Sequence, residues 1–395
     1  MTVAAFMDLA LYHPQLGYYA RTARRSGRAG DFVTSVDVGS LFGRLLAQQV
    51  AELADLLAAS PRAPVPADGQ PAPDRRSPGG SGAAAAFDLV EAGAGDGRLS
   101  ADLLRELQRS RPDVYARTRL HLVEVSEPAR REHRSVLGHL ADRLASSGPS
   151  LPDAFEGVLL ANELLDAFPV HQVVMRTDGL REVFVRAATP SDRSDPELDL
   201  IEGEPSTPLL EEYLDRVDAA LEPGWRAEIN LRAPAWVAEA ARRLRRGFML
   251  IIDYGHDARD LYSVRHAGGT LTAISRHTVR GPAPPAPPRT GPAQPRPGWL
   301  AEPGDRDLTA HVDFTAIRGA AEASGLEVVA FTDQTYFLLG LFSSDRLRDL
   351  DLRDRLALKT LTMPGGLGST HKVLILAKGV RVGPLAGCSW GQRVT

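Results

Sequence analysis

The sequence lacks several features that would define a protein class. Its 395 residues hold a single cysteine, Cys388, which excludes an intrachain disulfide and a zinc site built on several thiolates. The longest apolar runs, such as 248–252, are far shorter than the ~20 residues that cross a bilayer. We therefore expect a protein of a reducing compartment, located in the cytoplasm and without membrane insertion.

The chain also has no large excess of charge of either sign. The 46 Lys+Arg are balanced by 50 Asp+Glu, and the net charge of -4 provides no basic field for nucleic acid. Hydrophobic residues make up 43% and charged residues 24%, which is ordinary for a folded protein and too apolar for a wholly disordered one. We expect a folded chain of one or two domains that does not bind nucleic acid.

Two proline-rich segments interrupt the chain. Segment 61–86 contains six prolines and segment 281–298 contains eight, a density that opposes both helices and strand ladders. We expect both to be loops within one architecture, with docking of a proline-binding partner as the alternative. The predicted regions are an N-terminal helical and loop region covering the active site (1–60), the first insertion (61–86), a core with a hairpin and helical insertion at 170–245 (87–280), the second loop (281–298), a C-terminal part completing the sheet and substrate side (299–379) and a tail (380–395).

The remaining segments alternate between helical and strand patterns. A helical pattern over 38–57 precedes strand 87–90, helix 99–108, strand 120–125, helix 132–140 and strand 157–161. This order is typical of an α/β fold with a mostly parallel sheet and helices on both faces. Further expected elements are a hairpin at 170–185 with an Asp-Gly turn, helices at 207–221 and 234–245, and strands at 248–252, 326–332 and 371–377.

A glycine-rich turn lies between predicted strand 87–90 and predicted helix 99–108. Its sequence is Glu91-Ala92-Gly93-Ala94-Gly95-Asp96-Gly97. Glycines let the backbone turn tightly and approach a ligand, and the following helix offers unpaired N–H groups. The spacing differs from the G-x-G-x-x-G of dinucleotide sites and resembles motif I of class I S-adenosylmethionine (SAM)-dependent methyltransferases. We therefore expect Glu91, Gly93, Gly95 and Gly97 at a nucleotide-like cofactor.

Glu124 ends the next predicted strand and is the expected partner of that turn. A carboxylate there can accept hydrogen bonds from ribose hydroxyls, a role found in both NAD and SAM sites. Glu124 therefore does not distinguish a SAM-dependent enzyme from an NAD-dependent oxidoreductase, which is kept as an alternative. The simplest alternative is that the glycines only form a turn and Glu124 is solvated.

Further strings extend the resemblance to a family. Together and in order, they resemble the MidA family, bacterial relatives of the mitochondrial complex I assembly factor that methylates a protein arginine. The resemblance runs from about residue 5 to residue 378. The strings are Leu11-Tyr12-His13-Pro14, Gly17-Tyr18-Tyr19, Gly30-Asp31-Phe32-Val33-Thr34-Ser35, Leu41-Phe42-Gly43, 161–170 (ANELLDAFPV), Ile252-Asp253-Tyr254-Gly255, Gly269-Thr270-Leu271 and 307–314 (DLTAHVDF).

This resemblance implies a class I, Rossmann-like methyltransferase fold with a smaller accessory α/β region. It implies SAM as the methyl donor and a protein or peptide arginine as the acceptor, with a respiratory-complex subunit as one candidate acceptor. A homodimer is the candidate assembly. The string at 30–35 has the composition of a segment that closes over a cofactor. Asp31, Phe32 and Thr34 are therefore expected to contact SAM.

Three polar residues follow the third predicted parallel strand, at the sheet edge where ligands bind. An arginine acceptor needs carboxylates that match its planar, charged guanidinium. Glu163 and Asp166 are expected to supply them, and the Asn162 amide is expected to bind the cofactor or the acceptor. The alternative for the two acids is a helix N-terminal cap.

Two more catalytic candidates come from later strings. Asp253 closes the buried strand 248–252 at the same edge, with a loop acid as the alternative. His311 could accept a proton after transfer together with Asp313, although Asp313 could equally cap a helix. The histidines show no linear spacing such as H-E-x-x-H, so we predict no metal.

The function predicted from these residues is SAM-dependent methylation of a protein arginine. Methylation of a small molecule by the same chemistry is the first alternative, because the fold does not determine the acceptor. A SAM-binding assembly factor without turnover is the second.

Overall fold

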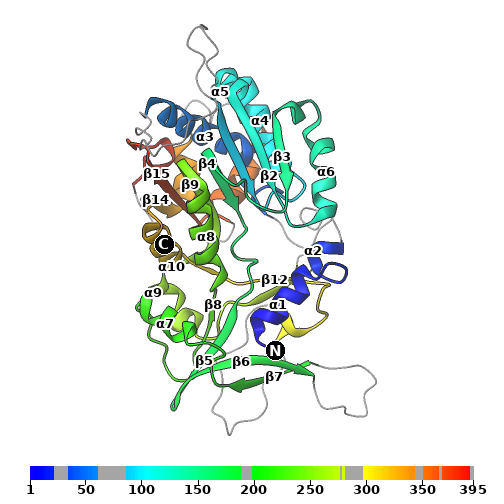
Figure 1. Cartoon of the computed structure of the whole chain (residues 1–395), viewed down its shortest axis with the longest axis vertical. Helices are drawn as coiled ribbons and strands as arrows, with labels where there is room; N and C mark the ends of the chain where they lie inside the picture. Colours follow the sequence, from blue (N-terminus) through cyan, green and yellow to red (C-terminus); the bar gives the residue numbers. More distant parts are fainter. Residues whose placement is uncertain are drawn as a thin grey trace, which may run out of the picture.

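A mostly parallel sheet organises the upper half of the molecule in Figure 1. The computed structural model describes residues 1–21, 34–60, 86–187, 198–275, 278–280, 297–342, 350–363 and 367–391. Within them, the sheet order is β14-β15-β9-β4-β1-β2-β3, and β13 pairs with β9. The strands are β1 (Phe87–Ala92), β2 (Thr118–Val123), β3 (Leu144–Gly148), β4 (Phe155–Asn162), β9 (Leu244–His256), β13 (Val312–Asp313), β14 (Glu327–Asp333) and β15 (His371–Lys378).

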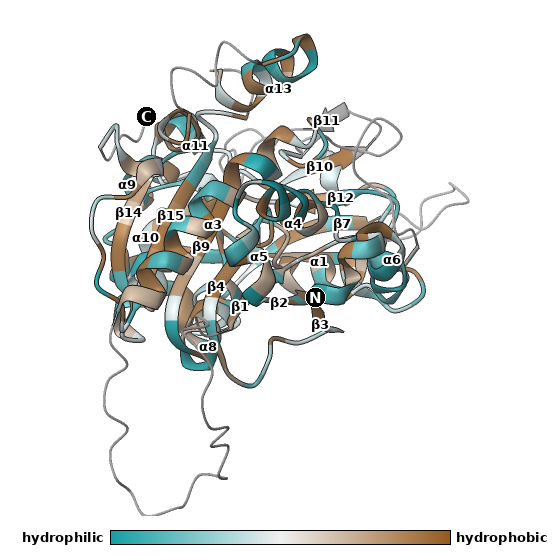
Figure 2. Ribbon diagram, turned by 90° about the horizontal axis from the view of Figure 1, so that it is seen from above, coloured by the Kyte–Doolittle hydropathy of each residue, from teal (hydrophilic) through white to brown (hydrophobic). Residues whose placement is uncertain are grey.

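The strand directions follow from the connections. Strands β1, β2, β4 and β9 pair in parallel because helices connect them, whereas β15 runs antiparallel to both of its neighbours. All six residues of β1 are buried. Such complete burial requires helices on both faces of the sheet, and the hydrophobic strands of this sheet are brown in Figure 2.

An apolar core lies on each face of the main sheet. One packs α3 (Leu41–Ala59), α4 (Arg98–Ser110), α11 (Gln334–Gly340) and α13 (Leu352–Thr362) against the sheet, and the other packs α8 (Arg232–Arg243) and α10 (Phe314–Ala323). Helices α5 (Pro112–Arg117) and α6 (Glu127–Leu137) complete the β1–β3 side. The predicted α/β class and the predicted mostly parallel sheet are confirmed.

A second, mainly antiparallel part lies below the sheet in Figure 1. It contains a four-stranded sheet, β7-β6-β5-β8, and a three-stranded sheet, β11-β10-β12. Its elements are α1 (Val3–Tyr12), α2 (Tyr18–Arg21), β5 (His171–Arg176), β6 (Gly179–Ala187), β7 (Leu198–Gly203), α7 (Leu209–Arg216), β8 (Arg226–Ile229), α9 (Ala258–Leu261), β10 (Thr272–Ser275), β11 (Thr278–Arg280) and β12 (Asp307–Thr309). The predicted hairpin is present as β5 and β6.

The predicted N-terminal region, 1–60, contributes to both parts. Helix α1 packs in the accessory core with Val183 and Leu308, whereas α3 packs in the main core. Most of the two proline-rich segments, 61–85 and 281–296, lie outside the described residues. In the part of the chain that the structure describes, no helix is long and apolar enough to cross a membrane.

Candidate functional site

A cavity of about 380 Å³ lies at the carboxyl ends of β1, β2 and β4. In open α/β sheets this edge is where ligands bind. Residues from α1, α2 and the start of β12 also reach the cavity, so the accessory part forms one of its walls. Of the predicted site residues, those that line it are Thr34, Glu91, Gly93, Gly95, Glu124, Asn162, Glu163 and Asp166.

The glycine turn is held from two sides. Gly95 N–H donates to Glu124 Oε2 at 2.9 Å, and His133 Nε2–H donates to the Gly95 carbonyl oxygen at 2.8 Å. The φ angle of Gly95 is 52°, in the left-handed region that favours glycine. A Cβ atom at Gly95 would meet no protein atom within 4 Å. The turn thus leaves space in the cavity for a ligand to approach its backbone.

Gly97 has a different place from the one predicted. It caps α4 with φ 89° and is absent from the cavity lining. Its glycine character is explained by this positive φ, which a residue with a Cβ rarely adopts. Asp31 and Phe32 lie outside the described residues.

Glu124 lines the cavity, and two backbone N–H groups hold its carboxylate. Its Oε1 accepts from Ser126 N–H at 2.7 Å, while Oε2 accepts from Gly95. A carboxylate has about four acceptor positions, so two stay available for hydroxyl donors. Burial raises the pKa of this carboxyl above its ordinary value.

Glu91 is buried beneath the turn, where Ser100 Oγ donates to its Oε2. Burial raises the pKa of the Glu91 carboxyl to about 8. The folded protein therefore binds this proton more tightly than the unfolded chain does.

We expect the free energy of unfolding to fall as the pH rises from about 4.5 to 8, because the unfolded chain loses this proton first. Glu91→Gln should remove roughly 3 to 5 kcal/mol of that decline, at 1.36 kcal/mol per pKa unit. Urea unfolding at half-unit pH steps measures it. The exposed Glu211→Gln is the control and should retain the wild-type slope. Identical slopes for Glu91→Gln and wild type would contradict the raised pKa.

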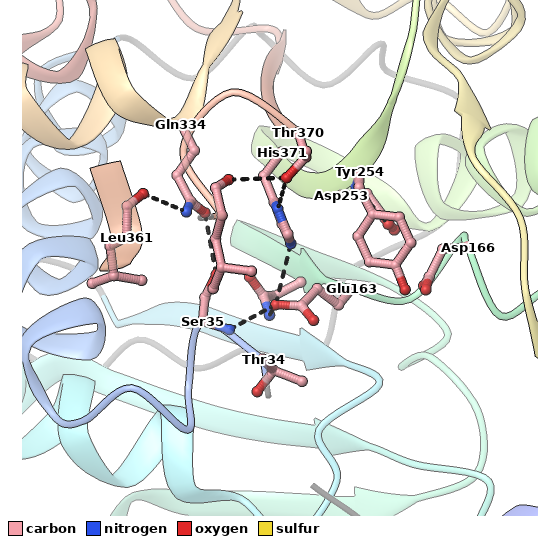
Figure 3. A network of polar contacts seen from close by, with 12 residues as sticks. Thr34, Ser35, Glu163, Asp166, Asp253, Tyr254, Gln334, Leu361, Thr370 and His371 are labelled. Atoms are coloured by element: carbon pink, nitrogen blue, oxygen red, sulfur yellow. Dashed lines mark hydrogen bonds and ion pairs between the residues drawn. The ribbon is translucent and has the colours of Figure 1, made fainter. Parts of the chain in front are cut away.

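The segment after β4 is a turn and not the helix start that the capping alternative requires. Glu163 adopts φ 48°, a left-handed conformation that is strained for a side chain and is often found at functional sites. Its Oε1 accepts from Ser35 N–H at 2.9 Å and lies 3.6 Å from His371 Nε2 (Figure 3). The carboxylate is therefore held in place by segments far apart in the sequence.

Asp166 is buried in the same wall and ends a chain of hydroxyl groups (Figure 3 shows it facing the Tyr254 hydroxyl). Thr309 Oγ1 lies 2.8 Å from Asp166 Oδ2 and 2.9 Å from the Tyr254 hydroxyl oxygen. Burial raises the pKa of Asp166. Two buried acceptors, Asp166 Oδ1 and Asn162 Oδ1, have no hydrogen-bond partner among the described residues. Each can accept from a ligand.

Asp253 does not line the cavity. Its Oδ2 accepts from the N–H groups of Leu164 and Leu165 at 3.1 and 2.8 Å, and its Oδ1 accepts from Tyr254 N–H. The carboxylate is fully buried and burial raises its pKa strongly. The structure therefore makes Asp253 a positioning residue for the turn that carries Glu163, in place of the predicted contact with the acceptor.

His311 also lies outside the cavity lining. Burial lowers its pKa to about 3, so its imidazole is neutral at neutral pH and is a poor proton acceptor after transfer. Asp313 accepts from Thr315 and Ala316 N–H and caps α10. The capping alternative therefore describes Asp313, and the predicted His-Asp proton relay has no support in the geometry.

Tyr12 and Asp307 line the cavity together with Tyr19, although neither Tyr12 nor Asp307 was predicted to be a site residue. Tyr12 donates its hydroxyl to the Ala167 carbonyl at 2.9 Å, and Tyr19 donates to Asp307 Oδ1 at 2.9 Å. The two rings lie 5.4 Å apart between centroids and form an aromatic wall. Both tyrosines and Asp307 fall within the strings that carry the family resemblance, which was the available signal.

The cavity is rich in acidic residues. Among the described lining residues, six are acids and one is an arginine: Glu91, Asp96, Glu124, Glu163, Asp166, Asp307 and Arg98. With its pKa raised to about 8, Glu91 is mostly neutral at neutral pH, so the negative charge comes from the other acids. Arg98 is already paired with Asp37 and Asp96. An acidic cavity with apolar walls attracts cationic ligands. These hydrogen-bond acceptors fit a ligand that carries ribose hydroxyls and positive charge.

Comparison with known proteins identifies the group to which this site belongs. Residues 78–332 match a family model described as S-adenosyl-L-methionine-dependent methyltransferase. The chain is 28% identical to the mitochondrial protein arginine methyltransferase NDUFAF7 homolog of Drosophila melanogaster, over 96% of this chain and 82% of that protein. It is 28% identical to mitochondrial NDUFAF7 of Mus musculus, over 89% of this chain and 72% of that protein.

A solved structure from Burkholderia thailandensis is similar over the whole fold. It has a TM-score of 0.80 and 27% identity, and the match covers 100% of this chain and 91% of that one. That protein was crystallised with S-adenosyl-homocysteine bound.

These relatives overturn one prediction. The names of the Drosophila and mouse proteins place them in mitochondria, which contradicts the predicted cytoplasmic location. The prediction was wrong because its evidence, a single cysteine and no membrane-spanning run, does not distinguish one reducing compartment from another.

Proposed function

The chain belongs to the MidA-like family of SAM-dependent methyltransferases, and we propose that it methylates an arginine side chain of a protein or peptide. The predicted enzyme class and the predicted cofactor, SAM, are confirmed by the family match and by the related structure with bound S-adenosyl-homocysteine. The acceptor is the part that we propose.

The observation that carries the proposal is the pair of carboxylates in the turn after β4. Glu163 and Asp166 both line the cavity, and Asp166 Oδ1 is a buried acceptor without a partner among the described residues. A guanidinium presents several N–H donors in one plane and keeps its charge at neutral pH. Two carboxylates at one wall satisfy both properties. The names of the curated relatives support the same acceptor.

The protein's task is to orient the acceptor nitrogen and to balance its charge. Bound SAM supplies a methyl group on a positively charged sulfur. The carboxylates hold the guanidinium by charge-assisted hydrogen bonds, which localises its positive charge away from the attacking nitrogen. The rings of Tyr12 and Tyr19 exclude water from this side of the cavity. Holding the acceptor nitrogen at near-attack distance from the methyl group supplies much of the rate.

The methylated guanidinium must lose one proton after the new N–C bond forms. Asp166 is suited to take it, because burial raises its pKa and so favours its protonated form. Thr309 connects Asp166 to Tyr254. Its Oγ1 lies 2.8 Å from Asp166 Oδ2 and 2.9 Å from the Tyr254 hydroxyl oxygen.

The acceptor class can be tested with isotopically labelled SAM. Incubation of the enzyme with cell extract should label protein, and mass spectrometry of peptide digests should place the methyl group on arginine. The Gly95→Val variant serves as the inactive control. Label found only in small molecules would contradict the arginine proposal and favour the small-molecule alternative. A respiratory-complex subunit as acceptor and a homodimeric assembly stay predictions.

A further inference from the structure

Three histidines from separate segments meet beside the cavity. His256 ends β9, His266 ends the short 3-10 helix Val264–His266, and His311 lies between β12 and β13. Their ring centroids are 4.8 to 5.6 Å apart, and one ring nitrogen from each lies within 4.8 Å of the other two. None of the three lines the cavity.

Two of the three rings have ring nitrogens that are available to a metal ion. His266 Nδ1–H donates to the Asp260 carbonyl oxygen at 2.9 Å, which leaves Nε2 with its lone pair free. Histidines that bind metals typically make such a hydrogen bond through the other ring nitrogen. His311 Nδ1 is buried and has no hydrogen-bond partner in the described part of the chain. A ligand at His311 Nδ1 would supply the partner that this nitrogen lacks.

We propose that His256, His266 and His311 bind a first-row transition-metal ion, with Zn²⁺ as the best match. Three imidazoles are an established donor set for tetrahedral zinc, and a water molecule can complete the fourth position. Hard cations such as Mg²⁺ prefer oxygen donors and are disfavoured here.

The three ring nitrogens must move closer together to bind one ion, but only by a small distance. Nitrogens bound about 2.0 to 2.1 Å from one zinc ion lie roughly 3.4 Å apart, compared with the present limit of 4.8 Å. All three residues are partly exposed, so side-chain rotation can supply the difference and the ion can enter from solvent.

The proposed role of the ion is to position a wall of the cavity. It would join the end of β9, the 3-10 helix and the β12–β13 connection. The His311 ring packs edge-on against Tyr254 at 6.1 Å, and Tyr254 reaches Asp166 through Thr309. The ion would therefore hold the residues that support the acceptor side, without contacting the reacting atoms.

Metal titration of the untagged, chelator-treated protein tests this proposal without any methyl acceptor. Competition with a chromophoric chelator should show one Zn²⁺ bound per chain. Co²⁺ should give the intense visible absorption of a four-coordinate site, and Mg²⁺ should not compete. Zn²⁺ should also raise the melting temperature of the wild-type protein.

The variants His266→Ala and His311→Asn should each weaken Zn²⁺ binding by roughly 100-fold or more and abolish the melting-temperature increase. The exposed His139→Ala is the matched control and should bind as wild type. Circular dichroism checks that each variant is folded, and two different variants protect the test against loss of one. Less than 0.1 equivalent of Zn²⁺ bound by wild type, or equal binding by wild type and both cluster variants, would overturn the proposal.

Discussion

Gly95→Val should lower the affinity for SAM by at least about 100-fold while the protein stays folded. The left-handed φ of Gly95 and the empty space around its hypothetical Cβ place a valine side chain inside the cavity. Its methyl groups would occupy volume that the cofactor needs, and about 1.4 kcal/mol is lost for each tenfold of affinity. Isothermal titration calorimetry with SAM measures the loss.

Backbone strain is the competing explanation, and the chain offers a matched control for it. Gly138 has φ 56°, an exposed position and no protein atom within 4 Å of the place that a Cβ would take, but it lies outside the cavity lining. Gly138→Val should therefore also incur backbone strain, of roughly 1 to 3 kcal/mol, and leave SAM affinity unchanged. If Gly95→Val and Gly138→Val bound SAM equally well, the glycine turn would not be the cofactor site.

Glu163→Gln should reduce methyl transfer to an arginine acceptor by about 30- to several-thousand-fold. Removing one partner of a charge pair in a largely dry site costs roughly 2 to 5 kcal/mol. The amide keeps the size of the side chain and can still accept from Ser35 N–H, so the change tests charge and not packing. Single-turnover rates at saturating SAM measure the effect, and calorimetry should show SAM affinity within about threefold of wild type.

Asp166→Asn provides the second half of this test. Burial raises the pKa of Asp166, so the wild-type rate should fall as the pH is lowered, with a midpoint above the ordinary aspartate value. This limb should be absent in Asp166→Asn, which should also be slower. The exposed Glu204→Gln is the control and should behave as wild type. Wild-type rates for both Glu163→Gln and Asp166→Asn would exclude the carboxylate clamp and favour a neutral acceptor.

The strongest predictions came from local patterns. The buried strands β4, β9 and β15 contain continuous apolar runs at 158–161, 248–252 and 373–377, which can be recognised without any tertiary information. The glycine turn was equally evident, because its residues are consecutive. In contrast, β3 and β7 are short and mostly exposed or half-buried, and β10–β12 have three or four residues each, so they lack a periodic signal.

Residues that depend on long-range contacts were harder to assign. Asp253 was correctly placed at the sheet edge, but only the folded chain shows that its carboxylate binds the backbone of the turn after β4 instead of facing the cavity. Similarly, no linear spacing connects His256, His266 and His311, although their rings lie together.

The sequence by itself determined the α/β class with its mostly parallel sheet, the glycine turn and the family, because each is carried by runs of residues that are consecutive along the chain. Only the tertiary structure decided which polar groups share one cavity and which are buried supports. Glu163 meets Ser35 and His371, and Asp166 meets Thr309, across separations of more than a hundred residues. Burial and charge at such meeting points set the chemistry of each side chain, and no local pattern encodes them.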